Sequence, residues 1–111
     1  MIEHTIRINY LLDFYKILLT EKQKFALEMY YQEDLSLVEI AQNIEVSRQA
    51  IYDLLKRGEA LLEEYEKNLH LYKKYLKRLE KAEKLVSTIN DLAIKEDNKK
   101  KIEDMINDLV D

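Results

Sequence analysis

The chain has 111 residues, a formal net charge of −4, one glycine, no proline and no cysteine, and it is rich in Leu, Glu and Lys. This length allows one domain, or one domain with an appendage, and the composition predicts an all-α fold while excluding disulfides and thiolate chemistry. No apolar run reaches membrane-spanning length and no secretory signal pattern begins the chain, so we expect a cytoplasmic protein without membrane contact.

Two helices are predicted in the N-terminal segment. The first spans Glu3 to Leu18, and its expected core face consists of apolar and aromatic side chains. These are Ile6, Tyr10, Leu11, Phe14, Tyr15 and Leu18. Thr20 and Gln23 form a capping box, in which each side chain accepts a backbone N–H of the other residue, and this pattern begins a second helix that continues through Tyr30.

The stretch LSLVEIAQNIEVSRQAIYDLLKR, residues 35–57, is typical of a helix-turn-helix. Ser36 with Glu39 makes a second capping box, and Ser47 caps the helix that follows. Apolar side chains recur at helical spacing in both helices and are expected to face inward. They are Val38, Ile40, Ala41, Ile44, Val46, Ala50, Ile51, Leu54 and Leu55. The intervening Glu45 holds the turn position at which positive φ is common, which Glu tolerates poorly.

The outward face of the second of these helices carries side chains suited to reading DNA. Arg can pair bidentately with guanine and Gln with adenine, whereas lysines and helix N-terminal groups bind phosphate. The candidate DNA-binding residues are Ser47, Arg48, Gln49, Tyr52, Lys56 and Arg57. The simpler interpretation is a solvated face on a helix retained for packing. Glu45 and Asp53 weaken the case for tight duplex binding, because both bring negative charge close to phosphate.

Beyond Arg57 the helix is expected to continue, with a bend at Gly58 or within residues 68–70. Apolar residues then recur at spacings of three and four, which forms a seam that requires a partner helix. They are Leu62, Tyr65, Leu69, Tyr72, Leu76 and Leu79. The seam either packs back on the N-terminal helices or forms a homodimer, and we favour the dimer. Asp97 is expected to cap a last helix, whose apolar side docks on a neighbouring element.

Positive charge is concentrated in the middle of the chain. Residues 1–46 hold 4 basic and 8 acidic side chains, residues 47–84 hold 10 and 7, and residues 85–111 hold 4 and 7. A basic stripe at helical spacing lies in the second of these segments. It consists of Lys73, Lys77, Lys81 and Lys84. Such a stripe is most often a solvated helix face, and the alternative is a surface that follows an RNA or DNA backbone.

No pattern in the sequence predicts an enzyme. His4 and His70 are isolated, so no metal site is expected. A single glycine cannot build the usual phosphate-binding loop. We therefore expect no catalytic residue, no metal and no cofactor.

The motifs NYLLDFY, LTEKQ, SLVEIA and VSRQAIYD together resemble the YlxM family of small bacterial proteins, over roughly residues 5–85. The helix-turn-helix of that family is in turn similar to the promoter-reading fourth region of sigma factors. Members are encoded beside components of the signal recognition particle. The resemblance therefore implies a role in that pathway, or in its regulation.

Two functions follow from these observations. In the first, residues 1–60 form a wingless helix-turn-helix domain that binds DNA, and residues 61–111 form a helical extension for dimerisation and packing. In the second, the protein is an accessory of the signal recognition particle that contacts its RNA or protein through the basic stripe. The first places the essential positive charge at residues 48–57, and the second places it at residues 73–84.

Overall fold

The computed structural model describes residues 2–111, which are all-α as predicted and contain no strand. Six α-helices and one short 3₁₀ helix follow one another along the chain. They are α1 (Ile2–Tyr15), η1 (Lys16–Leu18), α2 (Glu21–Tyr31), α3 (Leu37–Asn43), α4 (Arg48–Leu69), α5 (Leu71–Asn90) and α6 (Glu96–Val110).

The chain divides into two compact units, residues 1–72 and residues 73–111. This division lies twelve residues beyond the sequence-based one at residue 60. The difference arises because α4 extends to Leu69 and packs against the N-terminal helices along its length. Leu62 is fully buried in the core of the first unit, and Tyr65 and Tyr72 pack against that core.

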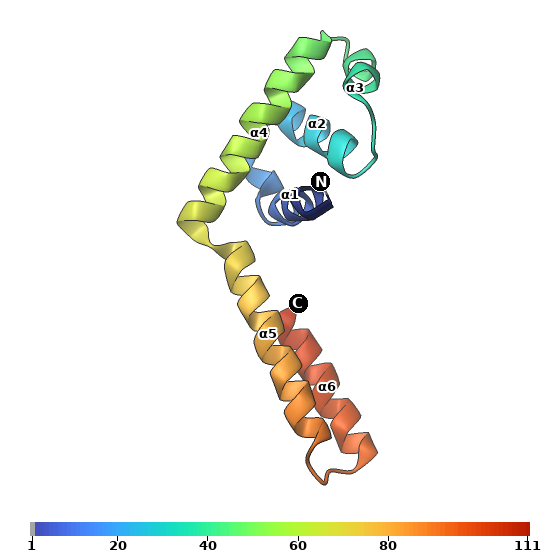
Figure 1. The fold of residues 1–111 in the computed structure, drawn as a ribbon, viewed down its shortest axis with the longest axis vertical. Coiled ribbons are helices and arrows are strands. Elements are labelled where there is room, and N and C mark those ends of the chain that lie inside the picture. Colours follow the sequence, from blue (N-terminus) through green and yellow to red (C-terminus); the bar gives the residue numbers. More distant parts are fainter. Residues whose placement is uncertain (1) are drawn as a thin grey trace. The chain divides into compact units, whose positions relative to one another are not determined.

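In the first unit, α1, α2 and α3 all lie against α4, on the same side of it (Figure 1). The core lies between these helices and is formed almost entirely by aliphatic side chains. Its fully buried members are Ile8, Leu11, Leu12, Tyr15, Ala26, Leu27, Ile40, Ile51 and Leu62. Helix α4 is therefore the element that the other three helices share, and their packing fixes where its remaining face points.

The predicted core face of the first helix is partly wrong. Leu11 and Tyr15 are buried as expected, but Ile6 and Leu18 are exposed, and Ile8 and Leu12 are buried in their place. Apolar residues occur around most of the circumference of α1, so their periodicity does not select one face. The α-helix also ends at Tyr15, and the 3₁₀ turn that follows changes the direction in which Leu18 points.

The bend predicted near the middle of the chain occurs at the later of the two expected places. Helix α4 ends where His70 adopts a left-handed conformation, with φ of 57°. Gly58 is buried inside α4, and a Cβ atom at this position would lie 2.7 Å from a methyl carbon of Leu27. The glycine thus permits the close approach of α2 to α4 and does not bend the helix.

A buried polar network closes the junction between α4 and α5. The hydroxyl of Tyr15 donates to Oε1 of Glu66 at 2.7 Å, and the same carboxylate oxygen accepts from the amide of Tyr72 at 3.0 Å. The amide of Leu71 donates to the Tyr15 oxygen at 3.1 Å. Burial, and then the hydrogen bond to Glu66, raise the pKa of Tyr15. Side chains from α1 and α4 thus satisfy the first free amides of α5.

The predicted seam is not one continuous surface. His70 interrupts the helix between Leu69 and Tyr72, so the two halves of the seam lie on separate helices. For Leu62, Tyr65 and Tyr72 the packing alternative is confirmed, because they lie in or against the core of the first unit. Tyr72 stacks on Tyr10 with 5.0 Å between ring centroids, and the Tyr65 hydroxyl donates to the carbonyl of Leu18. Leu76 remains exposed.

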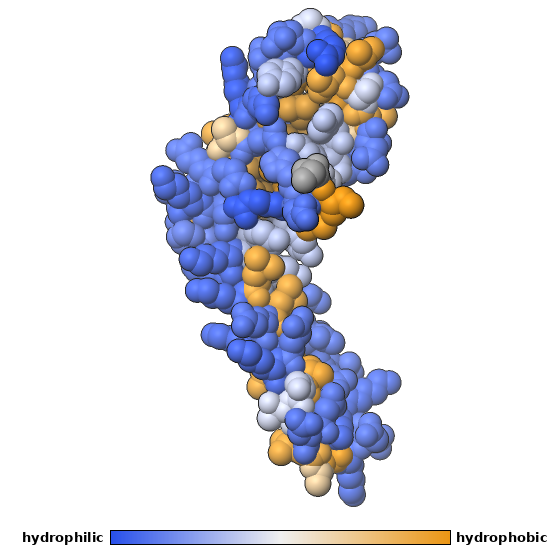
Figure 2. Space-filling view, viewed as in Figure 1, coloured by the Kyte–Doolittle hydropathy of each residue, from blue (hydrophilic) through white to orange (hydrophobic). Residues whose placement is uncertain are grey.

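In the second unit, residues 73–90 of α5 and the whole of α6 form a helical hairpin. Ile89, Ile106 and Val110 are its buried side chains. The last helix begins two residues earlier than predicted, with Lys95 at the N-cap, and Asp97 lies within its first turn. A carboxylate at that position interacts favourably with the helix dipole even though it is not the cap. Apolar residues interrupt the polar surface of this hairpin (Figure 2).

Candidate nucleic-acid interface

The helix-turn-helix is assembled from local signals that the sequence predicted. The Ser36 hydroxyl accepts from the Glu39 amide at 3.1 Å, and the Glu39 carboxylate accepts from the Ser36 amide at 3.0 Å. The hydrogen bond from the Ser36 amide, and then one from the Ser36 side chain, hold the pKa of Glu39 below its usual value. The same reciprocal pattern joins Thr20 and Gln23 at the start of α2.

The turn between α3 and α4 requires one left-handed residue. Glu45 adopts φ of 54°, as its position predicted, and the amide of Val46 then donates to the carbonyl of Ala41 at 3.1 Å. The Ser47 hydroxyl caps α4 by accepting from the Ala50 amide at 3.0 Å. The turn thus reverses the chain within a few residues and begins α4 beside α3.

Buried contacts fix the orientation of the first part of α4. Ile51 and Leu55 face the core, where they belong to the same apolar cluster as Ile40 and Ala41 of α3. Ala41 is small and buried, as a close crossing of the two helices requires. Because residues 51 and 55 point inward, the opposite face of α4 must point to solvent.

All six candidate DNA-binding residues are exposed at the N-terminal end of α4. Gln49, Lys56 and Arg57 lie on the face opposite the buried pair, whereas Arg48 is exposed because it is in the first turn. Ser47, Arg48, Gln49, Tyr52, Lys56 and Arg57 are exposed, and they span less than three turns of α4. The ammonium group of Lys56 lies 5.5 Å from the centroid of the Tyr52 ring. We name residues 47–57 the recognition segment.

One contact within the recognition segment was not expected. Nε2 of Gln49 donates a hydrogen bond to Oδ1 of Asp53 at 3.2 Å, one helical turn further along. One of the two amide hydrogens of Gln49 is therefore occupied, and its other amide hydrogen and its Oε1 are left as a donor and an acceptor. Asp53 is also an acceptor, so the two side chains together present acceptors to an incoming ligand.

Ion pairs to α1 and a hydrogen bond to α2, which sequence reasoning missed, connect these helices to the middle of α4. Arg7 makes a bidentate pair with Glu63, at 2.7 and 2.8 Å, which lowers the pKa of Glu63. Nε2 of His4 lies 2.9 Å from Oε1 of Glu59, and the hydroxyl of Tyr31 donates to the same oxygen. Burial, followed by this hydrogen bond, raises the pKa of Tyr31. Each pair joins residues more than 25 positions apart, a separation at which helical spacing carries no signal.

The basic stripe lies in the second unit, on α5, and all four of its lysines are exposed. Lys84 pairs with Glu80 one turn earlier, at 3.5 Å. The neighbouring Arg78 lies over the ring of Tyr75, 5.9 Å from its centroid. Residues 71–84 of α5 hold six basic and two acidic side chains, which makes this end of the helix strongly positive.

Two further observations concern the described chain as a whole. Among residues 2–111, no three His, Cys, Asp or Glu side chains come close enough to hold a metal ion. None of the helices in this range combines the length and the apolar character that crossing a bilayer requires.

Comparisons with known proteins agree with the helix-turn-helix geometry. The sequence profile of the UPF0122 family, the YlxM/p13-like helix-turn-helix proteins, matches residues 2–107. A UPF0122 protein of Oceanobacillus iheyensis is 53% identical over 96 residues, which cover 86% of this chain and 91% of that protein. A UPF0122 protein of Geobacillus sp. is 50% identical over 110 residues, which cover 98% of this chain and 96% of that protein. A UPF0122 protein of Bacillus pumilus is 49% identical over 104 residues, which cover 94% of each chain. The family is one of helix-turn-helix proteins, and this chain belongs to it.

Proposed function

We propose that this protein is a DNA-binding regulator that reads base sequence with the recognition segment of α4. The observation that carries the proposal is the division of α4 into two faces. Ile51 and Leu55 anchor one face in the core, the opposite face presents Lys56 and Arg57, and Arg48 is exposed in the first turn. A helix presented N-terminus first is the geometry with which helix-turn-helix proteins enter the major groove.

The proposed roles follow from the chemistry of each side chain. Arg48, in the first turn, pairs with guanine, and Tyr52 contacts a thymine methyl group or a phosphate. Ser47 and Arg57 position the helix on the DNA backbone, and Lys56 contributes charge near the bases. The proposed activity is binding alone, without a catalytic residue, metal or cofactor. Because its ligand is DNA, we propose that the protein acts in the cytoplasm.

The pairing of Gln49 with Asp53 refines what is read. With its amide group donating to Asp53, Gln49 offers an acceptor to the major groove, where cytosine N4 and adenine N6 are the donors. We therefore propose that this pair selects a cytosine or an adenine. Because Gln49 has a second amide hydrogen, bidentate pairing with adenine is compatible with this hydrogen bond.

Selection of binding sites from random duplex DNA, followed by titration of single variants, tests the proposal. Arg48→Ala should cost roughly 1–3 kcal/mol of binding free energy and relax base preference at one position, whereas Lys56→Ala should weaken all sequences alike. Lys67→Ala is a matched control, because Lys67 is an exposed lysine at the far end of the same helix. If wild type and Arg48→Ala select the same sites with the same affinity, direct reading by α4 is excluded.

A second candidate function rests on the exposed charge of α5. In this proposal the protein acts in the signal recognition particle pathway, or regulates it, and the basic stripe contacts the particle's RNA or protein. Lys77→Glu together with Lys84→Glu should then abolish binding to particle RNA and reduce its salt dependence. If the double variant binds RNA like wild type, and Arg48→Ala alone impairs nucleic-acid binding, the DNA proposal remains.

The homodimer expected from the sequence is also part of the proposal. Two copies would carry two recognition segments, which matches the paired half-sites that dimeric helix-turn-helix proteins bind.

A further inference from the structure

Helix α3 brings no positive charge to the DNA that the recognition segment is proposed to bind. In helix-turn-helix proteins, the helix before the reading helix crosses the DNA backbone. That helix is α3 in this chain, and the charged side chains between Ser36 and Ser47 are Glu39 and Glu45, both acidic. Phosphates on this side of the recognition segment therefore need a cation from another element.

Four basic side chains precede the recognition segment, and two of them are already paired. Arg7 is held in its bidentate ion pair with α4, and Nζ of Lys24 lies 3.6 Å from the carboxylate of Glu21. The other two are Lys16 and Lys22, which are both exposed. The missing cation is therefore sought at these two positions.

Lys22 lies beside the turn that leads into α4. A shallow hollow of about 280 Å³ is found there, lined by Glu21, Lys22, Phe25 and Ile44. Ile44 is the C-cap of α3, and Ser47, the first residue of the recognition segment, follows three residues later. Because three residues span at most about 10 Å, the hollow adjoins the N-terminal end of the recognition segment.

The chemistry of the hollow suits a nucleic-acid backbone. Lys22 and Phe25 are three residues apart on α2, a spacing that places both side chains on the same face of the helix. The side chain of Phe25 is 44% exposed, so an apolar surface lies next to the ammonium group. A DNA backbone alternates a charged phosphate with the less polar carbon face of a deoxyribose, and the hollow offers a surface of matching character to each.

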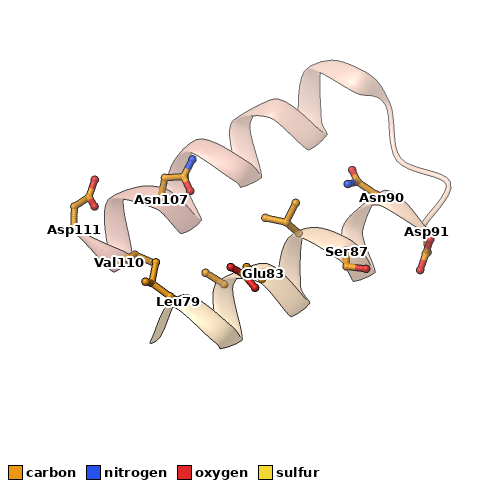
Figure 3. A pocket seen from close by; sticks show the side chains of 10 residues that line it. Leu79, Glu83, Ser87, Asn90, Asp91, Asn107, Val110 and Asp111 are labelled. Carbon is orange, nitrogen blue, oxygen red and sulfur yellow. The ribbon is translucent and has the colours of Figure 1, made fainter. Parts of the chain in front are cut away.

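The wide groove in the second unit has the opposite character. It lies between α5 and α6 and has a volume of about 680 Å³ (Figure 3). Its lining includes the carboxylates of Glu83, Asp91 and Asp111, which repel an anion. Of these two surface hollows, the one at Lys22 is therefore suited to a phosphate.

We propose that Lys22 is a phosphate anchor outside the recognition helix, and that its ammonium group binds the DNA backbone beside the first bases that α4 reads. This inference rests on the DNA-binding function proposed above. Phosphates of one strand follow each other about every 3.4 Å along the DNA axis, so the anchor and these bases belong to the same few nucleotides. With Lys22 at one end of the recognition segment and Arg57 at the other, the two contacts fix the angle at which α4 enters the groove.

Titration of Lys22→Gln at several salt concentrations tests the anchor. The probes are a duplex with the site that the wild-type protein selects from random DNA, and a duplex of unrelated sequence. Loss of one phosphate contact should weaken binding to both roughly five- to tenfold at about 0.1 M salt and reduce the salt slope by about one. Lys67→Gln is the matched control, because it removes the same charge about 30 Å further along α4 and should change neither quantity.

A second substitution tests the same hollow through a gain of affinity, which a loss of folding cannot produce. Glu21→Gln removes the carboxylate from the hollow and releases Lys24, so it should strengthen binding to both duplexes. If Lys22→Gln binds like Lys67→Gln, or if Glu21→Gln has no effect, the anchor is wrong. Base reading by α4 then still stands, provided that Arg48→Ala relaxes site selection. A wild-type protein that binds neither duplex overturns the DNA-binding function and the anchor together.

Discussion

Replacing Glu45 by glycine should stabilise the protein. Glu45 has φ of 54° and an exposed side chain, so the substitution removes backbone strain without removing packing. The left-handed conformation costs a residue with a Cβ atom roughly 1–2 kcal/mol. Glycine loses roughly 0.5–1 kcal/mol more conformational freedom on folding. The free energy of unfolding should therefore rise by about 1 kcal/mol or slightly less, which corresponds to an increase in Tm of about 4 °C for a chain of this size.

Urea unfolding followed by far-ultraviolet circular dichroism measures this difference. Glu45→Ala is the matched control, because it removes the same carboxylate but keeps the Cβ atom and hence the strain. We expect Glu45→Ala to resemble wild type and Glu45→Gly alone to gain stability. Equal free energies of unfolding for the two variants would refute the argument, because any change would then come from the charge and not from the backbone.

Three further substitutions have clear expected results. Tyr15→Phe leaves the buried Glu66 carboxylate short of a donor and should lower the free energy of unfolding by about 1.5–3 kcal/mol in the same urea assay. Gly58→Ala should be destabilising by about 1 kcal/mol despite the better helix propensity of alanine, since the new methyl group would meet α2 at 2.7 Å, and a gain in Tm would contradict this. The lowered pKa of Glu63 contributes stability above its unfolded-state pKa that disappears as the pH falls through the folded-state value. Arg7→Gln should therefore lose less stability than wild type between neutral and acidic pH, and parallel pH profiles would count against the ion pair.

The local features of the fold could be predicted from the sequence because each depends on residues a few positions apart. The capping boxes at Thr20 and Ser36 and the cap at Ser47 formed as expected. The left-handed turn at Glu45 also followed from its place in the motif. These signals fix where helices begin and which face of the recognition segment points outward.

The features that were missed depend on residues far apart in the chain. Periodicity could not select the buried face of α1, where Ile8 and Leu12 replace Ile6 and Leu18 in the core. The apolar residues keep their spacing of three and four across His70, although the helix ends there. The spacing reflects side-chain type and carries no information on backbone conformation. No signal of helical spacing links Tyr15 to Glu66 or Arg7 to Glu63. The Gln49–Asp53 hydrogen bond was missed for a different reason: Gln49 has several polar neighbours within one turn, and spacing alone does not select one of them.

The network around Glu66 determines how the first unit can be isolated. A fragment that stops at residue 60 would lack Leu62 and Glu66, so the core would lose a fully buried leucine and the Tyr15 hydroxyl would lose its acceptor. A fragment that stops at Leu69 would remove the two amides that complete the network. The smallest self-sufficient form of this helix-turn-helix therefore ends after Tyr72, inside what appears along the sequence to be the next helix. The boundary of independent folding thus lies within a secondary-structure element, and a loop does not mark it.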